Sequence, residues 1–383
     1  MSRTLSDMRP VHVIGIGWHR YQFTSETPYV ELGLTAVRAA LADAGIPWPA
    51  VQTAYVAKAL LPMAPGRAML RHLGATGLEI LHVEDASASG SAAFRHACLE
   101  VASGASDVVL AMGVDKPARV ALAERSTGIP SLADDAIAPF THFAMLADQY
   151  AHRAGATVED IALVAVKNHR NGSLNPNAQH QKVRSLAEIM GGKAISGAFT
   201  SLQCTPVGEG AAAVIVASDD GIRALGVDPA RAIQVVASVG RSQRVYEDAT
   251  RFDALLTGET SGLAFAQSGL TAADLDVVEL HDAFTVEELE YVEAMGLCAE
   301  GDAVRQLKAG AFDIGGRCAV NPSGGLIAMG HPIGPTGIGQ IGEIVLQLRG
   351  EAGARQQPGA RTGLAHMVGI GAVCYVHILQ RPG

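Results

Sequence analysis

The chain has 383 residues, of which 48% are hydrophobic and 17% are charged, and it contains 43 glycines. This composition is typical of a compact α/β enzyme and excludes a disordered or fibrous chain, and the length suits two domains or two fused halves. The net charge of −9 argues against nucleic acid or an anionic membrane as the main binding partner.

The cysteines predict neither a disulfide framework nor a metal site. There are five, an odd number, and no pair has the spacing of zinc ligands. The N-terminal stretch MSRTLSDMRPVHVIGIGWHRY lacks the long apolar segment of a signal peptide. No run approaches the ~20 apolar residues of a spanning helix. We therefore expect a soluble, cytoplasmic protein with no membrane span.

The first part of the chain alternates between strand and helix patterns. The predicted elements are a strand at 11–16, a helix at 28–44, a strand at 51–60, a helix at 94–103 and a buried strand at 106–116. The first strand ends in Gly15 and Gly17, but the third glycine of a dinucleotide fingerprint would fall at Arg20. A dinucleotide-binding site is therefore not indicated.

The middle of the chain differs in character, and the alternation then resumes. Residues 117–200 are richer in charge and include a polar stretch, 168–181, which we interpret as an irregular and functional loop. Strand patterns return at 208–218, 232–240, 276–284 and 362–379. The sequence predicts two similar βα halves, residues 1–225 and 226–383, with a loop domain at about 117–200 inserted into the first.

The first motif that could carry chemistry is ASASGSAAF at 86–94, where small residues run into a predicted helix. Ser87 is the candidate nucleophile, because the positive end of a helix and its free N–H groups stabilise developing negative charge. The surroundings do not match the G-x-S-x-G pattern of a serine hydrolase. On this motif alone, close packing of helix against strand is the favoured explanation of the small residues.

Two histidine motifs follow. In ELHDAFTVEELEYVEAMGL (279–297), a short strand delivers His281 and Asp282 to the start of a helix, where a histidine can act as acid, base or oxyanion donor. In NPSGGLIAMGHPIGPTGIGQIGEIVLQL (321–348), dense glycines surround His331, without the Gly-Lys-Ser/Thr of a P-loop. A fourth motif, HMVGIGAV (366–373), places another glycine pair beside a strand.

Taken in order, these motifs resemble those of thiolases, and more narrowly of sterol-carrier-protein-type thiolases and related thiolase-like acyl-CoA acyltransferase subunits. The resemblance covers nearly the whole chain, and it includes KNHRNGSLNPNAQHQ, LQCTPVGEGAAAVIVAS, HDAF and NPSGGLIAMGHPIGPTG. It implies an α/β thiolase fold in which two similar halves form a five-layered αβαβα core, with the loop domain over the active site. It also implies a homodimer that uses coenzyme A thioesters as substrates and has no covalently bound cofactor.

The resemblance also implies roles for individual residues. His331 would activate the nucleophile at position 87 and help to form an oxyanion hole, and His281 would help to stabilise an enolate. Backbone N–H groups of Ser87 and Gly371 would bind the other developing negative charge.

The chain departs from the family pattern at the nucleophile and at the second cysteine. Ser87 stands where relatives carry cysteine, and a serine must lose its proton in the transition state to a base such as His331. The second cysteine is replaced at its two family positions by Ala283 and Met367. Cys318 and Cys374 lie outside both motifs, and we interpret them as structural.

Three explanations of Ser87 remain open: an engineered Cys→Ser change, a natural serine that still carries acyl groups, or loss of the nucleophile. The first two predict thiolytic cleavage of a 3-oxoacyl-CoA or the reverse Claisen condensation. The third predicts a retro-aldol lyase acting on a β-hydroxyacyl-CoA, with Tyr291 as the nearest tyrosine, or a non-catalytic acyl-CoA-binding subunit. Retention of His281 and His331 favours thiolase-type chemistry, and a small zinc-ribbon/OB-fold protein is a candidate partner.

Overall fold

The structure is a computed structural model that describes residues 4–117, 139–247, 249–369 and 373–382. Five strands belong to the first part of the chain: β1 (His12–Gln22), β2 (Thr53–Ala57), β3 (Glu79–Val83), β4 (Val108–Asp115) and β7 (Glu209–Ala217). Five more belong to the second: β8 (Ile233–Ser242), β9 (Val277–Glu279), β10 (Ala319–Val320), β11 (Thr362–Gly369) and β12 (Val373–Gln380).

The two sets of strands have the same order and the same directions. The first set is ordered β3-β2-β4-β7-β1, and the second β10-β9-β11-β12-β8. In each set the first three strands are parallel, and the fourth is antiparallel to both of its neighbours. A short pairing of His12 and Val13 with Gln234 and Ile233 joins the two sets at one corner. This repeated topology is what a duplicated βα unit produces.

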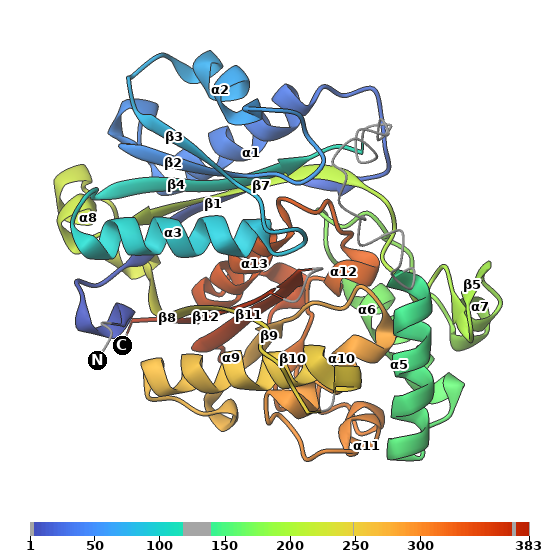
Figure 1. The fold of residues 1–383 in the computed structure, drawn as a ribbon. Helices are drawn as coiled ribbons and strands as arrows, with labels where there is room; N and C mark the ends of the chain where they lie inside the picture. The colour runs from blue at the N-terminus through green and yellow to red at the C-terminus, as the bar shows by residue number, and fades with distance from the viewer. Residues whose placement is uncertain (1–3, 118–138, 248, 370–372, 383) are drawn as a thin grey trace.

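Helices fill the space between the two sheets and cover their outer faces, giving the alternation of five layers visible in Figure 1. The inner layer consists of α3 (Ser89–Ser103) and α13 (Thr336–Arg349). The first outer layer consists of α1 (Tyr29–Ala44), α2 (Pro65–Leu70) and α8 (Asp219–Leu225), and the second of α9 (Phe252–Ser268) and α10 (Thr285–Ala294). The predicted αβαβα core is confirmed.

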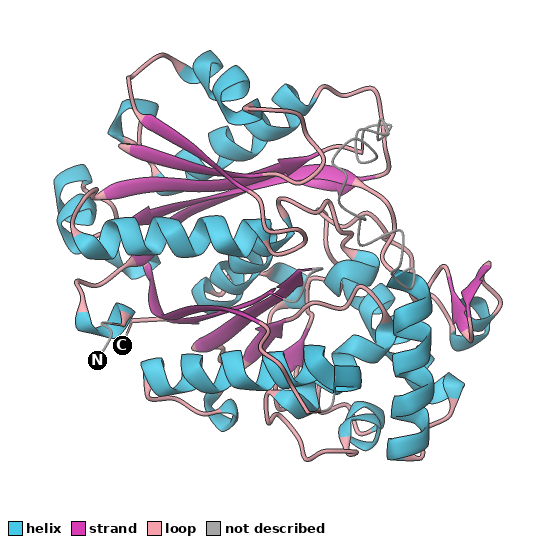
Figure 2. Cartoon of the chain, in the orientation of Figure 1, coloured by secondary structure: helices cyan, strands magenta, loops and turns pink. Residues whose placement is uncertain are grey.

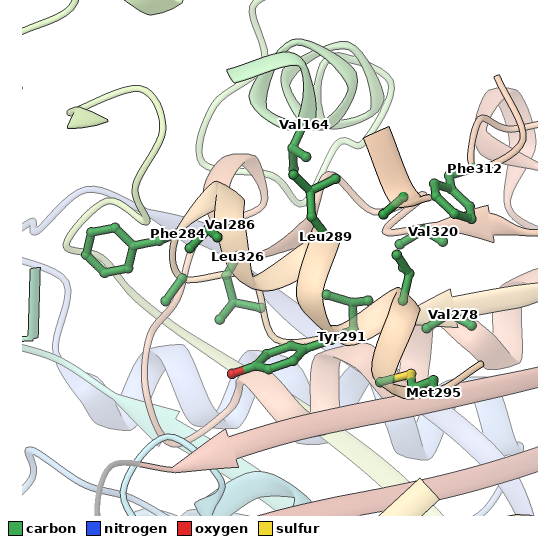
Figure 3. Packing of buried hydrophobic residues seen from close by; sticks show 14 of the residues in the cluster. Val164, Val278, Phe284, Val286, Leu289, Tyr291, Met295, Phe312, Val320 and Leu326 are labelled. Atoms are coloured by element: carbon green, nitrogen blue, oxygen red, sulfur yellow. The ribbon is translucent and has the colours of Figure 1, made fainter. Parts of the chain in front are cut away.

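Each interface between layers has its own hydrophobic core. Between the sheets, Phe94 and Val101 of α3 and Ile338 and Ile341 of α13 are fully buried against residues of both sheets, such as Val214. A second core lies under α1, and a third surrounds α10. Figure 3 shows the third, in which Val164, Leu289, Tyr291 and Leu326 pack together.

The inner helices approach each other closely at their N-terminal ends. A Cβ added to Gly90 of α3 would lie 2.8 Å from the carbonyl oxygen of Gly334 and 3.0 Å from the amide nitrogen of Ile338. Backbone therefore contacts backbone, and only glycine fits there. The helix α3 begins at Ser89, five residues before the predicted start at residue 94. Small polar residues are weak helix formers, so the position at which α3 begins is determined here by tertiary packing.

Residues 139–200 lie on one side of the layered core (Figures 1 and 2) and consist of helices, one small hairpin and an irregular stretch at 174–184. The helices and strands are α5 (Pro139–Ala154), α6 (Val158–Ser173), α7 (Leu186–Met190), β5 (Ala194–Ser196) and β6 (Phe199–Thr200). The expectation of an irregular loop from residue 168 is wrong for residues 168–173, which form the last turns of α6. Three of their polar side chains, those of Asn168, His169 and Asn171, are buried and hydrogen-bonded rather than solvated.

The remaining short helices are α11 (Ala303–Lys308) and α12 (Gly325–Ala328). No helix in the described part of the chain is long and apolar enough to cross a membrane. The boundary at residues 225/226 stays a prediction, and so does the inserted loop domain at about 117–200.

Candidate active site

Ser87 lies in a tight turn between β3 and α3, and only 8% of its surface is exposed. Ala86 before it has a φ of 48°, a left-handed conformation that alanine rarely adopts. The Ser89 hydroxyl fastens the turn, since Oγ accepts from the Asp85 N–H at 2.8 Å and donates to the Ala86 carbonyl at 2.6 Å. The turn therefore presents Ser87 just ahead of the first turn of α3, where the helix dipole favours negative charge.

His331 comes from the second half of the chain, in the loop between α12 and α13, and it contacts Ser87. Its Nε2 is 3.1 Å from Ser87 Oγ, and its Nδ1 is 2.8 Å from Oγ1 of Thr336. The single hydroxyl hydrogen of Thr336 is donated to the Pro332 carbonyl at 2.7 Å, so Oγ1 must accept from Nδ1–H. Nε2 consequently carries the lone pair and accepts the Ser87 hydroxyl hydrogen, as a general base beside a nucleophile should.

The environment of His331 keeps its imidazole neutral. Burial, and to a smaller extent the neighbouring His281, lowers the pKa of His331 to about 3. The partners of its ring nitrogens are the hydroxyls of Ser87 and Thr336 rather than carboxylates, so nothing bonded to the ring favours the imidazolium. A neutral base is suited to a hydroxyl nucleophile, which does not ionise in the ground state.

Asp115 holds the His331 loop against the first half of the molecule. This carboxylate at the end of β4 accepts the Gly334 N–H at 2.7 Å and the Ala59 and Leu60 N–H groups at 2.8 Å each. Burial raises the pKa of Asp115, and these backbone donors oppose that shift. The loop is therefore fixed relative to the sheet that carries Ser87.

His281 approaches from the other side of the site, with a carboxylate as its partner. Its Nδ1 is 2.8 Å from Oε1 of Glu287, and both side chains are almost fully buried. The Glu287 carboxylate also accepts the Phe284 N–H at 2.8 Å and the Tyr291 O–H at 3.1 Å. These donors hold Glu287 in one orientation and leave Nε2 as the nitrogen of His281 that is available to a ligand.

The two histidine rings meet edge to face. Their centroids are 5.7 Å apart and the ring planes are 89° from each other. Behind them, Nδ1 of buried His366 is 3.4 Å from the backbone nitrogen of His281, and Nε2 is 3.0 Å from Oγ1 of Thr257. Burial lowers the pKa of His366, so it serves as a neutral support of the His281 backbone.

A buried polar network joins α6 to the loops that carry both histidines. Asn168 donates to Asp282 Oδ2 at 2.8 Å and to Glu288 Oε2 at 2.9 Å. The ammonium of Lys167 is 3.0 Å from Glu288 Oε1, and Asn321 donates to Glu288 Oε2 at 2.9 Å. Burial, and then Glu288, raises the pKa of Asp282 well above its usual value. Lys167 thus offsets the charge of Glu288 inside the fold, and Asp282, which accepts from Asn168 and from the Leu326 N–H, fixes the His281 loop.

The positions at which relatives carry a second cysteine hold no thiol. Ala283 is in the His281 loop, and Met367 packs against Ala88 and Val373 next to the Ser87 turn. Burial raises the pKa of Cys204, Cys318 and Cys374 to about 12. Their burial agrees with the structural role expected for Cys318 and Cys374.

The last glycine loop approaches the Ser87 turn. A Cβ added to Gly369 would lie 2.7 Å from the Asp85 carbonyl oxygen and 3.4 Å from the Ala88 Cβ. Gly371, predicted as an oxyanion donor, lies outside the described residues. The structure thus brings Ser87, His281 and His331 together.

Sequence reasoning missed the partners that set the state of each histidine, Thr336, Glu287 and His366. Weak signals existed: a hydroxyl five residues after His331, and a carboxylate six residues after His281 at the start of a helix. In the described part of the chain, no group of His, Cys, Asp and Glu side chains is arranged to hold a metal ion. The described site is built from histidines, the hydroxyls of Ser87 and Thr336, and the carboxylate of Glu287.

Comparison with known proteins identifies the family. The description "Thiolase, N-terminal domain" matches residues 16–190, and "Thiolase C-terminal domain-like" matches residues 240–381. The chain is 36% identical over 389 residues to sterol carrier protein 2 of Gallus gallus, covering 96% of this chain and 71% of that protein. It is 34% identical over 373 residues to benzoylsuccinyl-CoA thiolase subunit BbsB of Thauera aromatica, covering 95% of each.

Solved structures share the fold. The chain superimposes on a structure titled "Ltp2-ChsH2(DUF35) aldolase" with a TM-score of 0.80 and 24% identity, over 97% of this chain and 98% of that one. At this identity the likeness establishes the fold alone. The layered architecture and the motifs read from the sequence agree with these matches, and the chain belongs to the thiolase family.

Proposed function

We propose that the protein is a thiolase-type acyltransferase that acts on acyl-CoA thioesters through an acyl-enzyme at Ser87. The reaction is thiolytic cleavage of a 3-oxoacyl-CoA or the reverse Claisen condensation. The observation that carries this proposal is the contact of 3.1 Å between Ser87 Oγ and the lone pair of neutral His331.

In the cleavage direction, Ser87 Oγ attacks the 3-oxo carbon while its proton moves to His331 Nε2. The C2–C3 bond then breaks, its electron pair stays on C2 as the enolate of the shorter acyl-CoA, and the remaining acyl group becomes an oxyester on Ser87. The thiol of coenzyme A attacks that ester, which gives the second acyl-CoA and restores the serine hydroxyl. The backbone N–H groups of Ser87 and Gly371 are proposed to bind the oxyanion at the carbon under attack, and His281 to stabilise the enolate.

Membership of the thiolase family also supports proposals about the domain organisation, the oligomeric state and the use of coenzyme A. The two halves, residues 1–225 and 226–383, support one acyl-CoA site in a homodimer, with coenzyme A as substrate rather than resident cofactor. BbsB is named a subunit, which supports a hetero-oligomer. We propose a small zinc-ribbon/OB-fold protein as the second component. We propose a cytoplasmic location.

A retro-aldol lyase is the second candidate, and one observation favours it. Ala283 and Met367 stand where a second thiol would take part in carbon–carbon bond chemistry. A lyase needs no acyl-enzyme, only a base for the 3-hydroxyl group of a β-hydroxyacyl-CoA, and His281 Nε2 or His331 Nε2 could serve. In that case Ser87 would only bind the substrate.

Products distinguish the two candidates. The protein is incubated with a 3-oxoacyl-CoA plus coenzyme A, and separately with the matching β-hydroxyacyl-CoA. Two acyl-CoA products from the first, absent with Ser87→Ala and increased with Ser87→Cys, would support acyl transfer. Release of an aldehyde or ketone from the second substrate, at equal rates in wild type and Ser87→Ala, would establish the lyase and overturn our proposal.

A further inference from the structure

The proposed reaction needs a second proton carrier. Cleavage leaves an enolate whose C2 must gain a proton, and condensation requires a proton to leave the same carbon. His331 is already committed to the Ser87 hydroxyl through Nε2 and to Thr336 through Nδ1. A different group must therefore exchange a proton with C2.

We propose that His281 is this proton carrier and that Glu287 is the positioning residue that makes it one, an inference that rests on the proposed function. In cleavage, His281 begins doubly protonated: its Nε2–H bond breaks and a C2–H bond forms with the electron pair of the enolate. When coenzyme A then attacks the ester, the proton of its thiol returns to Nε2, while His331 gives its proton back to Ser87 Oγ. In condensation, the C2–H electron pair forms the new carbon–carbon bond while Nε2 takes the proton. No further reactant is needed.

Glu287 fixes which nitrogen of His281 reacts. Its Oε1 lies 2.8 Å from Nδ1, so that hydrogen is held by the carboxylate and Nε2 is left for chemistry. No described residue forms a hydrogen bond with Nε2 of His281. Glu287 itself cannot reach a substrate, because it is buried and already accepts from Phe284 and Tyr291.

The carboxylate also lies where it can balance the charge of a His281 ring that holds two protons. A proton gained at Nε2 makes an imidazolium, and a negative charge 2.8 Å from Nδ1 stabilises it in a buried site. His331 has only hydroxyl partners, so the same proton would be less stable there. The two histidines are therefore suited to different steps.

The other titratable groups next to His281 are committed elsewhere. His366 uses both nitrogens, with the His281 backbone and Thr257. The Tyr291 O–H is donated to Glu287, and the Asp282 carboxyl accepts from Asn168 and the Leu326 N–H. Cys204 donates its S–H to the Thr200 carbonyl at 3.3 Å, and its raised pKa of about 12 disfavours a thiolate.

The test separates proton exchange at C2 from acyl transfer to Ser87. Acetyl-CoA and butanoyl-CoA are incubated with the protein in deuterated buffer, and deuterium at C2 is followed by mass spectrometry, with the acyl adduct on Ser87 measured in parallel. Glu287→Gln should slow exchange by about 100-fold or more, within the range for general acid–base catalysis, while acylation stays within about threefold. Glu290→Gln, the same change on the same helix, removes a partner of Arg153 instead and should alter neither rate.

Two outcomes in these assays would overturn the inference: exchange at the wild-type rate in Glu287→Gln, or equal loss of exchange and acylation. If the wild type exchanges deuterium at C2 but forms no acyl adduct, the proposed function is refuted and this inference stands. If it forms the adduct but does not exchange deuterium, this inference is refuted and the proposed function stands.

A measurement on the wild-type protein tests the inference even if the Glu287→Gln variant fails to fold. With ¹⁵N-labelled histidine, assigned by the signal lost in His281→Gln, NMR should show the hydrogen of neutral His281 on Nδ1. A hydrogen on Nε2 instead would overturn the inference.

Discussion

His331 and His281 have ring centroids only 5.7 Å apart, but their Nδ1 atoms have different partners. The partner of His331 is the Thr336 hydroxyl, and the partner of His281 is the Glu287 carboxylate. The first arrangement favours a neutral ring that accepts a proton from a nearby hydroxyl. The second holds the Nδ1 hydrogen on a carboxylate and leaves Nε2 for the substrate. The comparison teaches that the partner, rather than the histidine, decides which step each ring can perform.

The supports behind the two rings differ in the same way. The His331 loop is held by backbone amides bonded to Asp115 and by Thr336. The His281 loop rests on a buried network with formal charges, including Lys167 and Glu288.

Replacing His331 by alanine should remove the base beside Ser87 and slow acylation of Ser87 by about 10²–10⁴-fold. The rate of adduct formation with an acyl-CoA, followed by intact mass, checks this. His366→Gln, which alters a buried histidine bonded to Thr257, serves as the control and should retain acylation. Normal acylation in His331→Ala would mean that the base is elsewhere.

Lys167→Met should destabilise the fold by about 3–5 kcal/mol, because it leaves the Glu288 carboxylate buried without its cation. Urea unfolding measures this change. Lys182→Met, which removes an exposed ion pair with Glu188, should leave stability almost unchanged. Equal effects of the two changes would contradict a charged support under His281.

Thr336→Val keeps the shape but removes the acceptor of the His331 Nδ1–H. We expect about tenfold slower acylation, because the ring loses its fixed orientation and tautomer, and a loss of about 1 kcal/mol in stability. Thr336→Ser keeps the hydroxyl and should restore most of the rate. If serine and valine behave alike, the tautomer argument is wrong.

The pH dependence of acylation should be nearly flat between pH 8 and pH 5. The folded-state pKa of His331 is lowered to about 3, so the ring stays unprotonated and active through this window, and activity is lost only as pH falls toward that value. A histidine of ordinary pKa would be about 97% protonated at pH 5. Rapid-quench acylation at several pH values tests this, and a loss of rate centred near pH 6.5 would contradict it.

Much of the fold could be predicted from local pattern, whereas the three central side chains could be predicted only because their motifs resemble those of thiolases. Alternating strand and helix signals located most elements, and the motifs around Ser87, His281 and His331 are continuous in sequence. The hydrogen-bond partners of the two histidines could not be predicted in this way. Glu287 becomes the hydrogen-bond partner of His281 only because α10 begins immediately after the loop that carries His281. The first turn of this helix directs the Glu287 carboxylate back to the imidazole ring.

The polar end of α6 shows a second limit of sequence reasoning. Lys167, Asn168 and His169 look like a solvated loop from their composition, but they are buried in the helix. The structure satisfies them with partners far along the chain, such as Asp282 and Glu288, and such pairings are not visible as a periodic pattern.

The most direct test of the account is the mass of the wild-type protein after brief exposure to an acyl-CoA, followed by peptide mapping. We predict a single added acyl group, located on Ser87, which disappears on addition of coenzyme A and is absent from Ser87→Ala. An unmodified protein that nevertheless turns over its CoA substrate would contradict the acyl-enzyme and the role assigned to Ser87.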